Sequence, residues 1–509
     1  MNEHLILYPI LVHLITAILL LFFWMKPKIQ YYISIAGSAI GIIIGIVLFQ
    51  SVWENGIQSI QLGNWQAPFG ITMVSDTLSA SLVLIANIVA LAISINSTKT
   101  VVSTRIKFGY YAILHFLFMG LSGAFITGDL FSLYVWFEVI IISSFVLLTI
   151  GGRKNQIEGA VKYFTLNMIS SIIFLTAIGM VYGVTGSLNM ADISRIIPEI
   201  ENKGLVQTIS LIFFVGFGVK SGVFPLYFWL PASYHTPPAA VSALFAGLLT
   251  KVGVYAMIRV FTLLFPLGET NQLIIMIIAG LTIFFGGIGA IVQRDVLKVF
   301  SYLIICHIGF MVGGLGLFTG VALAGAVMYM FHDIIVKTTL FLMGGVFHRI
   351  FGSTRFENMG GLMDQYPRLS FLFAIPLFAL VGVPPLSGFW PKVSLFSAAY
   401  TRGEFFMLIM FIFASLITLI IIARVWNNIF SKRNIERKER VDMKYFNQFS
   451  LLQKISYIVP IILLVCFTLY YSFFAEHFQM VAKRISEELM NTEHYYNAVF
   501  GIKENNIKL

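Results

Sequence analysis

The chain has 509 residues, of which 58% are apolar and only 11% are charged. Soluble globular domains carry roughly 25% charged residues, so this composition excludes a multidomain soluble protein. The formal net charge of +10 does not predict nucleic-acid binding, because the Lys and Arg residues lie in short segments beside apolar stretches, where membrane orientation places them. The N-terminal apolar stretch lacks a basic start and a small-residue cleavage site, which predicts an uncleaved first span.

Metal and cofactor chemistry find little support in the sequence. The two cysteines, Cys306 and Cys466, lie in apolar stretches and are too few for an iron–sulfur cluster. The pattern also lacks a haem-like pairing of histidines and a Gly-rich nucleotide loop after a strand. We therefore expect no metal, no cofactor and no catalytic residues, in a protein that is not an enzyme.

Long windows of the sequence contain no Asp, Glu, Lys or Arg. They are residues 29–53, 77–98, 108–128, 163–191, 221–250, 270–293 and 299–332. A bilayer core about 30 Å thick needs ~20 apolar residues per helix, so each window can span it. In lipid the backbone must satisfy its own hydrogen bonds, which leaves helices or closed barrels, and these windows lack the alternation of barrel strands. The sequence therefore predicts an all-α, polytopic membrane bundle.

The apolar stretches and the turn residues between them predict 14 transmembrane helices. In chain order these spans are residues 4–24, 29–53, 73–96, 109–127, 130–150, 160–182, 206–229, 242–265, 273–291, 296–315, 320–347, 370–399, 404–426 and 454–474. The chain then divides into four parts. These are spans 1 to 3 in 1–108, a first five-helix repeat in 109–265, a second in 273–426, and a cytoplasmic loop, span 14 and C-terminal tail in 427–509.

Basic residues are unevenly divided between the predicted loops. The even-numbered loops hold only Arg195, Lys203 and Arg402. The odd-numbered loops hold Lys26, Lys28, Lys99, Arg105, Lys107, Arg153, Lys154, Arg294, Arg349, Arg355, Arg368, Lys432, Arg433, Arg437, Lys438, Arg440 and Lys444. Because cytoplasmic loops are enriched in Lys and Arg, the odd loops are predicted to be cytoplasmic and both termini to lie outside.

Two predicted spans are interrupted in the same style. Proline breaks span 7 at Pro225 and span 12 at Pro384 and Pro385, and Lys220 and Lys392 lie close to these breaks. Proline inside a helix removes a backbone hydrogen bond, so such a break is retained where the freed carbonyls line protein or water. Spans 7 and 12 run in opposite directions, as two inverted five-helix repeats, spans 4–8 and 9–13, would give. The alternative is that the prolines are simple kinks.

Ionisable residues lie deep inside several predicted spans. They are Glu138 in span 5, Lys220 in span 7, Lys251 in span 8, His332, Asp333 and Lys337 in span 11, and Lys392 in span 12. A charge at the bilayer centre costs ~2.5 to 3.5 kcal/mol on insertion scales, so these side chains should face a polar interior and have partners. Burial disfavours the charged form of an amine, so a buried lysine can load and release a proton near neutral pH. This pattern predicts a charge pathway.

Each of these residues also has a structural interpretation. Glu138 and Lys220 could form a static buried ion pair that fixes helix register. Asp333 and Lys337 have the i, i+4 spacing of an ordinary intrahelical pair. Four other histidines are interpreted as packed or interfacial: His13, His115, His307 and His348. Two acids that begin spans are interpreted as helix caps: Asp76 and Asp129.

Four segments together resemble the antiporter-like membrane proteins that Mrp multisubunit cation/proton antiporters share with respiratory complex I. The segments are 128–138 (GDLFSLYVWFE), 217–255 (opening FGVKSGVFPLYFWLPASYHTPPAAVSA), 331–342 (FHDIIVKTTLFL) and 383–392 (VPPLSGFWPK). Within this superfamily the pattern is most similar to the D-type members of Mrp antiporters. Trp229 is followed by Leu-Pro-Ala-Ser-Tyr rather than by the acidic Leu-Pro-Asp-Ala of many complex I members, and the early segment 63–71 (GNWQAPFGI) also matches.

The resemblance implies 14 core helices with inverted repeats, discontinuous spans 7 and 12, and a hydrated row of charged residues at the membrane midplane. It also implies a hetero-oligomer with the other Mrp subunits, A, B, C, E, F and G, in the lipid of a bacterial plasma membrane. Such a complex exchanges cytoplasmic Na⁺ for external H⁺, driven by the proton gradient. The implied proton pathway consists of Glu138, Lys220, Lys251, His332, Lys337 and Lys392. The first two form a coupled pair, the next three a central relay, and the last serves the far half-channel.

One departure from the family pattern concerns span 11. Many members place the histidine four residues before the lysine, whereas His332 and Lys337 are five apart, with Asp333 beside the histidine. Their faces differ by about 140° at 3.6 residues per turn, which weighs against a direct relay between them. The alternative function is the same type of membrane component in a complex I-type NADH:quinone oxidoreductase, where redox chemistry elsewhere drives proton pumping.

Overall fold

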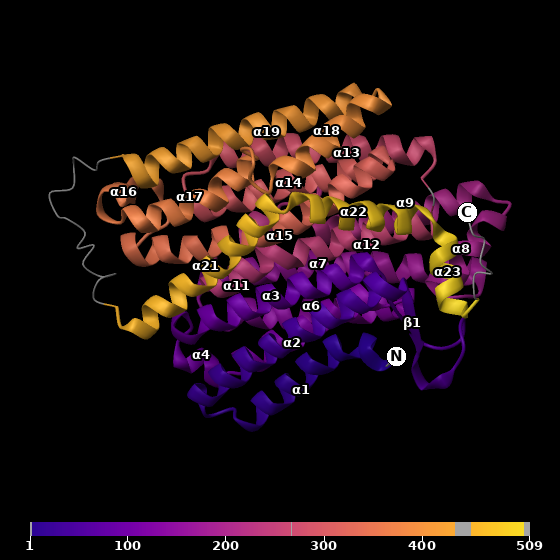
Figure 1. The fold of residues 1–509 in the computed structure, drawn as a ribbon, viewed down its shortest axis with the longest axis horizontal. Helices are drawn as coiled ribbons and strands as arrows, with labels where there is room; N and C mark the ends of the chain where they lie inside the picture. The colour runs from indigo at the N-terminus through magenta and orange to yellow at the C-terminus, as the bar shows by residue number, and fades with distance from the viewer. Residues whose placement is uncertain (1–2, 266, 433–448, 503–509) are drawn as a thin grey trace.

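Long helices lie side by side along the longest axis of the molecule and form one bundle (Figure 1). The computed structural model describes residues 3–265, 267–432 and 449–502. The helices of the first half are α1 (Tyr8–Phe22), α2 (Pro27–Asn55), α3 (Thr77–Thr100), α4 (Ser103–Lys107), α5 (Tyr110–Ile126), α6 (Leu130–Thr149), α7 (Lys154–Thr185), α8 (Met190–Glu199), α9 (Lys203–Ser221), α10 (Trp229–Ser233), α11 (Ala239–Leu244) and α12 (Thr250–Leu263). Those of the second half are α13 (Glu269–Val292), α14 (Val296–Leu317), α15 (Gly320–Phe351), α16 (Leu362–Gln365), α17 (Pro367–Val381), α18 (Phe389–Arg402), α19 (Phe405–Trp426), α21 (Leu451–Phe473), α22 (Ala475–Met490) and α23 (Thr492–Phe500).

Twelve of the described helices are long and apolar enough to cross a membrane, and α5 and α17 are shorter apolar helices of the same bundle. Large apolar side chains are exposed on the outer helices, among them Ile43 on α2, Ile172 on α7 and Ile409 on α19. Exposed apolar surface of this kind suits contact with lipid, where helices satisfy their own backbone hydrogen bonds. The chain is therefore a predominantly helical, multi-pass membrane protein, as the apolar windows predicted.

A two-stranded hairpin follows α2 and was not predicted. Strands β1 (Gln58–Gln61) and β2 (Thr72–Ser75) pair antiparallel, with Gln58 opposite Ser75 and Gln61 opposite Thr72. The hairpin lies at the end of the bundle that carries both chain termini (Figure 1). Its side-chain alternation is too short to stand out beside the long apolar runs that flank it.

The two central parts of the chain repeat one backbone arrangement. Asp129 caps α6 by accepting a hydrogen bond from the Ser132 N–H at 2.6 Å, and Asp295 caps α14 by accepting one from the Leu297 N–H at 2.9 Å. Each cap is bridged to a segment that follows the next helix, Asp129 to Asn189 and Asp295 to Arg355. The flanking bonds are Leu130 N–H to Leu188 O and Met190 N–H to Gly128 O in the first case, and Val296 N–H to Thr354 O and Phe356 N–H to Arg294 O in the second.

The same bonds therefore recur at a constant spacing of 166 residues (130 to 296, and 188 to 354). The first bridge precedes α8, and the second lies just before α16, which is at the opposite end of the bundle (Figure 1). The two bridges therefore lie at opposite ends of the bundle.

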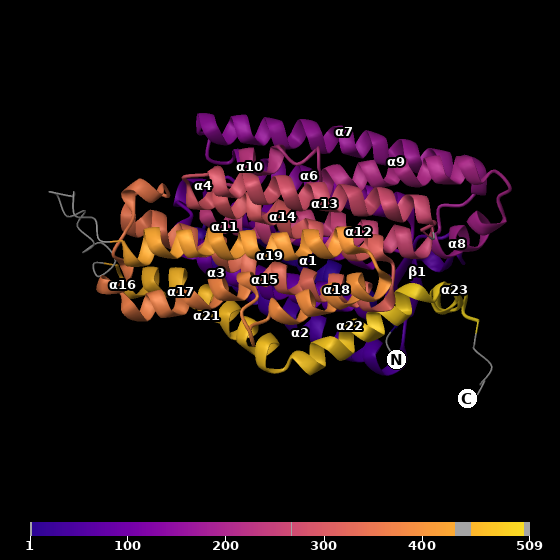
Figure 2. The same ribbon diagram turned by 90° about the horizontal axis from the view of Figure 1, so that it is seen from above.

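The breaks predicted in spans 7 and 12 also share their backbone structure. Helix α9 ends before Gly222 and α17 ends before Gly382, and both glycines adopt a positive φ, 77° and 86°, that favours glycine. After each glycine the next N–H returns to the helix, from Val223 to Gly218 O at 3.0 Å and from Val383 to Phe378 O at 3.2 Å. The chain then resumes as α10 and α18. In Figure 2, α9 leads towards α10 in the direction opposite to that of α17 towards α18.

The C-terminal segment is more ordered than the tail that the sequence predicted. After α21, helices α22 and α23 pack back onto the bundle, and α22 lies against α15 and α3. Thr77 donates its backbone N–H and its hydroxyl to the Glu488 carboxylate, at 3.0 and 2.6 Å. The predicted basic loop residues Arg433, Arg437, Lys438, Arg440 and Lys444 lie outside the described residues.

Candidate functional site

Glu138 and Lys220 come from neighbouring helices but do not form the direct ion pair that the static interpretation required. Lys220 lies in the last turn of α9, where its Nζ donates to Ser171 Oγ at 3.1 Å and lies 4.7 Å from the centre of the Phe137 ring. Glu138 is the next residue on α6, and no described residue donates a hydrogen bond to its buried Oε1. The acid and the amine thus share one region without being locked together.

A small cavity adjoins Lys220. It measures about 20 Å³, and its polar lining residues are Lys220, Asn167, Tyr163 and Trp229, beside apolar side chains such as Leu249. A polar cavity needs roughly 10–15 Å³ in this measure to hold one water molecule. The space beside the Lys220 amine therefore matches a single water.

Lys251 and Asp333 form a buried ion pair between α12 and α15. Lys251 Nζ lies 2.6 Å from Asp333 Oδ2, and both side chains have 0% exposure. Lys251 follows a π-helical turn, Phe245–Leu249, and also donates to the Ala246 carbonyl at 2.9 Å. Single π turns inside α-helices are frequent at functional sites.

Gly247 in this π turn sets the distance between α12 and α15. A Cβ atom at Gly247 would meet Thr338 Oγ1 and would lie 3.1 Å from Ile334 O, both on α15. Because the π turn lies directly against α15, Lys251 can reach the carboxylate of Asp333.

Two further groups converge on Asp333. His307 of α14 places Nδ1 3.3 Å from Asp333 Oδ1 and Nε2 3.1 Å from Thr418 Oγ1 of α19. Lys337, one turn along α15, places Nζ 4.0 Å from the same Oδ1, and among the described residues no acceptor takes a hydrogen bond from this amine. His307, Asp333 and Lys337 are all fully buried.

Lys392 lies at the broken end of α17. Its Nζ donates to Val381 O at 2.7 Å, with Leu380 O at 3.4 Å, and these are terminal carbonyls of that helix. A cation is favoured there, because the helix dipole presents partial negative charge at its C-terminus. His332 also contacts this break, since its Nδ1 lies 2.9 Å from Ser387 Oγ.

The buried cluster contains more amines than carboxylates. Lys251 comes from α12 of the first half of the chain, and Lys337 and Lys392 come from the second half. Among the described residues, Asp333 is the carboxylate paired with Lys251 and Lys337. Three ammonium groups with one carboxylate would leave an excess of two positive charges at low dielectric, which is costly. A neutral form of one or more of these amines would reduce this excess charge.

The structure brings together most of the predicted residues but orders them differently. Lys251 and Lys337 of the predicted central relay both approach Asp333, which was not part of that prediction, whereas His332 lies towards Ser387. The separation of His332 from Lys337 agrees with the 140° between the two positions on the helix. His307 was interpreted as a packing residue and instead contacts Asp333. The available signal was weak: His307 is a histidine at the centre of a predicted span without a proposed partner.

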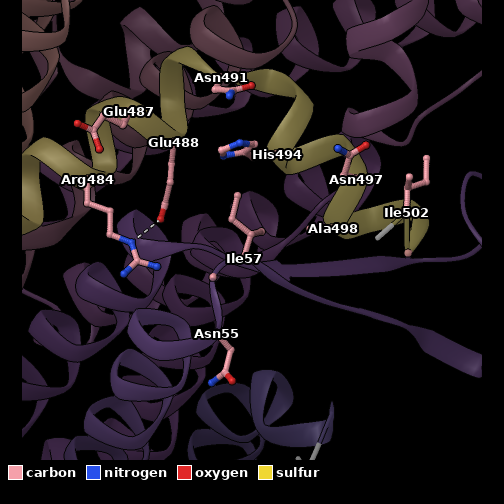
Figure 3. A pocket seen from close by; sticks show the side chains of 12 residues that line it. Asn55, Ile57, Arg484, Glu487, Glu488, Asn491, His494, Asn497, Ala498 and Ile502 are labelled. Atoms are coloured by element: carbon pink, nitrogen blue, oxygen red, sulfur yellow. Dashed lines mark hydrogen bonds and ion pairs between the residues drawn. The ribbon is translucent and has the colours of Figure 1, made fainter. Parts of the chain in front are cut away.

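A separate polar cleft of about 790 Å³ opens at the end of the bundle that carries both termini. Figure 3 shows side chains of α22, α23 and the turn after α2 around it, with Arg484 Nε 3.1 Å from Glu488 Oε1. Arg484 also donates to Trp53 O at 2.6 Å and to Val52 O at 3.1 Å. These charges join the C-terminal helices to α2, and none of the predicted pathway residues lines the cleft.

Comparison with known proteins gives one consistent family. Residues 127–418 match the family described as "NADH:quinone oxidoreductase/Mrp antiporter, TM". The chain is 40% identical to the D subunit of the Na⁺/H⁺ antiporter of Alkalihalophilus pseudofirmus, over 98% of this chain and 99% of the relative. The chain belongs to this NADH:quinone oxidoreductase/Mrp antiporter family. The D subunit of the Na⁺/H⁺ antiporter of Bacillus subtilis is a further member, 39% identical over 98% of this chain and 99% of its own length.

Solved structures show the same fold for related membrane proteins. A chain of the Mrp complex from Dietzia sp. DQ12-45-1b superposes with a TM-score of 0.89 at 22% identity, covering 98% of this chain and 100% of that one. A chain of an archaeal membrane-bound sulfane sulfur reductase, a respiratory membrane complex, superposes with a TM-score of 0.87 at 25% identity, covering 98% and 100%. The buried cluster and the Glu138 region both lie inside the segment that matches the family.

Proposed function

We propose that this chain is the proton-translocating subunit of a multisubunit Na⁺/H⁺ antiporter, a secondary transporter rather than an enzyme. The observation that carries the proposal is the buried cluster in which Lys251 and Lys337 share the carboxylate of Asp333, with Lys392 held on the carbonyls of the α17 break. Two relatives that match over nearly their full length are named as D subunits of Na⁺/H⁺ antiporters. Their names support Na⁺ and H⁺ as the transported ions. The likeness to a respiratory membrane complex favours a second candidate, a redox-driven proton pump, which would move protons without requiring Na⁺.

The relay runs through Asp333. Its carboxylate holds Lys251 at 2.6 Å and stands 4.0 Å from Lys337, so a small side-chain movement exchanges the favoured partner. Whichever amine loses the carboxylate is left buried and unpaired, and releases its proton more readily. The proton is thereby passed from the α12 side of the cluster to the α15 side.

The two ends of the relay are Lys220 and Lys392. Lys220 receives a proton through the adjoining cavity, with Glu138 favouring the charged amine from the same region. Lys392 receives it from the cluster and holds it on the terminal carbonyls of α17. His332, beside the same break, links the break to α15 and does not pass the proton directly to Lys337.

We propose 14 membrane crossings with two inverted five-helix repeats, spans 4–8 and 9–13, within the parts 109–265 and 273–426. The recurrence of the cap and bridge bonds after 166 residues (130 to 296, and 188 to 354) supports the repeats, as does the matching structure of the two breaks. The basic residues of the odd loops and the position of both termini at one end of the bundle support an outer location of the termini. The complex would contain Mrp subunits A, B, C, E, F and G and lie in a bacterial plasma membrane.

Neutral substitutions in the complete complex test the relay. Glu138→Gln, Lys220→Met and Lys392→Met each remove one ionisable group, and Na⁺-dependent proton movement is measured in everted membrane vesicles. We expect each to lower exchange by about 10²-fold or more, the usual contribution of a proton-transfer group, with the complex still assembled. A matched control is Lys162→Met with Glu158→Gln, an exposed pair 2.6 Å apart on α7.

Three outcomes separate the candidates. Undiminished exchange in the Glu138 and lysine variants contradicts the relay. Loss of assembly in these variants, but not in the control, supports a purely structural role for the buried charges. Proton movement that persists without Na⁺ supports the redox-driven candidate.

A further inference from the structure

Two histidine rings face each other among the N-terminal helices, away from the charged cluster. His13 of α1 and His115 of α5 place their Nδ1 atoms 3.1 Å apart, with ring centroids 5.3 Å apart. Their exposures are 1% and 0%. Neither residue lies in the segment that matches the family, residues 127–418. The sequence pattern indicated packing, but two nitrogen atoms at this distance require a shared proton.

Each outer ring nitrogen also has a partner. His13 Nε2 lies 3.0 Å from Asn87 Oδ1, and the Asn87 amide in turn donates to Val83 O at 2.8 Å. His115 Nε2 lies 2.9 Å from Ser34 Oγ. The Asn87 side chain fits because Gly41 lacks a Cβ atom that would meet its Oδ1.

A short chain of serine hydroxyls continues from Ser34. Ser34 Oγ lies 3.0 Å from Ser94 Oγ, which lies 3.1 Å from Ser38 Oγ. Ser38 donates to the Ser34 carbonyl at 2.9 Å, so the Ser38 oxygen is free to accept from Ser94. Helices α1, α2, α3 and α5 thus contribute to one continuous hydrogen-bonded row.

With both rings neutral, the ring hydrogens have a single arrangement, and the contact between Ser34 Oγ and Ser94 Oγ is left without a hydrogen. Asn87 Oδ1 can only accept, so His13 carries its hydrogen on Nε2 and accepts on Nδ1. His115 must then donate from Nδ1 and accept on Nε2 from the Ser34 hydroxyl. Ser94 donates onward to Ser38.

Adding one proton to His115 Nε2 supplies the hydrogen that the neutral row lacks. The Ser34 hydroxyl rotates, accepts from the protonated Nε2 and donates to Ser94 instead. A second proton would place two N–H groups against each other across the 3.1 Å between the Nδ1 atoms, which repels. The pair therefore has room for one proton and no more.

The two rings lie in a largely uncharged environment. Phe118 covers both rings, with centroids 5.5 Å from His13 and 6.5 Å from His115, and α2 and α3 contribute only the serines and Asn87. Among the described residues no Asp, Glu, Lys or Arg is bonded to either ring. The other titratable groups on these four helices are Tyr8 of α1, Lys28, Tyr31, Tyr32 and Glu54 of α2, Lys99 of α3, and Tyr110 and Tyr111 of α5. Tyr31 contacts the Tyr111 ring and Lys99, and Tyr110 contacts Tyr111.

We propose that His13 and His115 form a proton-binding site that takes up a single proton between α1 and α5. The described residues contain no group of three or more side chains suited to a metal ion, so a proton rather than a metal is the ligand that this geometry accepts. The proposal does not depend on the relay through Asp333. Ionisable groups deep inside membrane helices are costly and mark ion or proton sites.

Solid-state ¹⁵N NMR of the complete complex, labelled with [¹⁵N]histidine, tests the site across the range of about pH 5 to 8 in which imidazoles titrate. In the wild-type complex we expect one imidazolium signal, coupled across the Nδ1 pair, that grows as pH falls and is missing in His115→Gln. The control is His4→Gln, an exposed histidine of the same terminal region, which should leave that signal unchanged.

A second variant tests the site by changing the pH at which it takes up its proton. Asn87→Asp places a carboxylate 3.0 Å from His13 Nε2 without a change in size, and it should raise the pH midpoint of the signal by about one to three units. A structural histidine pair would not respond in this way. Identical spectra for the wild-type and His115→Gln complexes overturn the proposal. If His115→Gln fails to assemble, an unmoved midpoint in Asn87→Asp overturns it.

Discussion

Lys251 and Asp333 form a fully buried ion pair across α12 and α15, with 2.6 Å between Nζ and Oδ2. The pair joins helices of the two proposed repeats. It also places a carboxylate between amines of both halves, since Lys337 approaches the same group.

Removing one member of this ion pair should destabilise the complex more than removing both members. Asp333→Asn leaves Lys251 buried without a counter-ion, and we expect about 3–5 kcal/mol of lost unfolding free energy. The double variant Lys251→Met, Asp333→Asn removes both charges and should recover a large part of that loss, while proton exchange remains absent. Thermal unfolding of the purified complex, measured beside exchange in vesicles, checks both. Equal stability of the single and double variants would show that the pair is not coupled.

Gly247→Ala should separate α12 from α15 without changing any charge. The added methyl group would meet Thr338 and the Ile334 carbonyl, so the π turn has to move away and Lys251 loses reach to Asp333. Overpacking of this kind costs about 1–3 kcal/mol. We expect reduced exchange and a lower unfolding temperature. Gly179→Ala, on α7 where a Cβ atom would meet nothing within 4 Å, is the matched control, and equal effects at both positions would contradict the prediction.

Local physics made much of the fold predictable. Acids that precede long apolar runs were interpreted as caps, and Asp76 and Asp129 do accept hydrogen bonds from Ser79 and Ser132. The proline breaks were located correctly because proline and glycine act on the backbone wherever they stand. The helix boundaries were predicted less accurately. Span 6 was predicted at 160–182, but α7 extends from Lys154 to Thr185. Its polar first turns continue the helix beyond the apolar window.

The site depended on tertiary placement that spacing does not encode. Asp333 and Lys337 have the i, i+4 spacing of a local pair, yet Asp333 lies much closer to Lys251, on another helix. The packing of small residues, such as Gly309 against α13, decides which face of α14 lies towards α15. His307 is on that face.

His307 should act by holding the Asp333 carboxylate in place. Its two nitrogens connect Asp333 to Thr418 at 3.3 and 3.1 Å, so His307→Leu removes a bond to a charged group, worth about 1.5–3 kcal/mol. We expect slower exchange in His307→Leu and partial recovery in His307→Gln, which retains a donor. Exchange in vesicles measures both. His348→Gln, at an exposed position near the end of α15, serves as the control, and full activity of His307→Leu would contradict the assignment.

Gly382→Ala should displace Lys392 from the carbonyls of α17. Gly382 has φ of 86°, and a Cβ atom there would lie 3.1 Å from Lys392 Cδ and 3.3 Å from its Nζ. Gly403 has a similar φ of 76°, but a Cβ atom would meet nothing within 4 Å. Alanine in the left-handed conformation costs about 1–2 kcal/mol at either position. Both variants should therefore lose comparable stability, whereas only Gly382→Ala should lose proton exchange in vesicles. Equal loss of exchange at the two glycines would mean that backbone strain, and not the position of the Lys392 amine, limits transport.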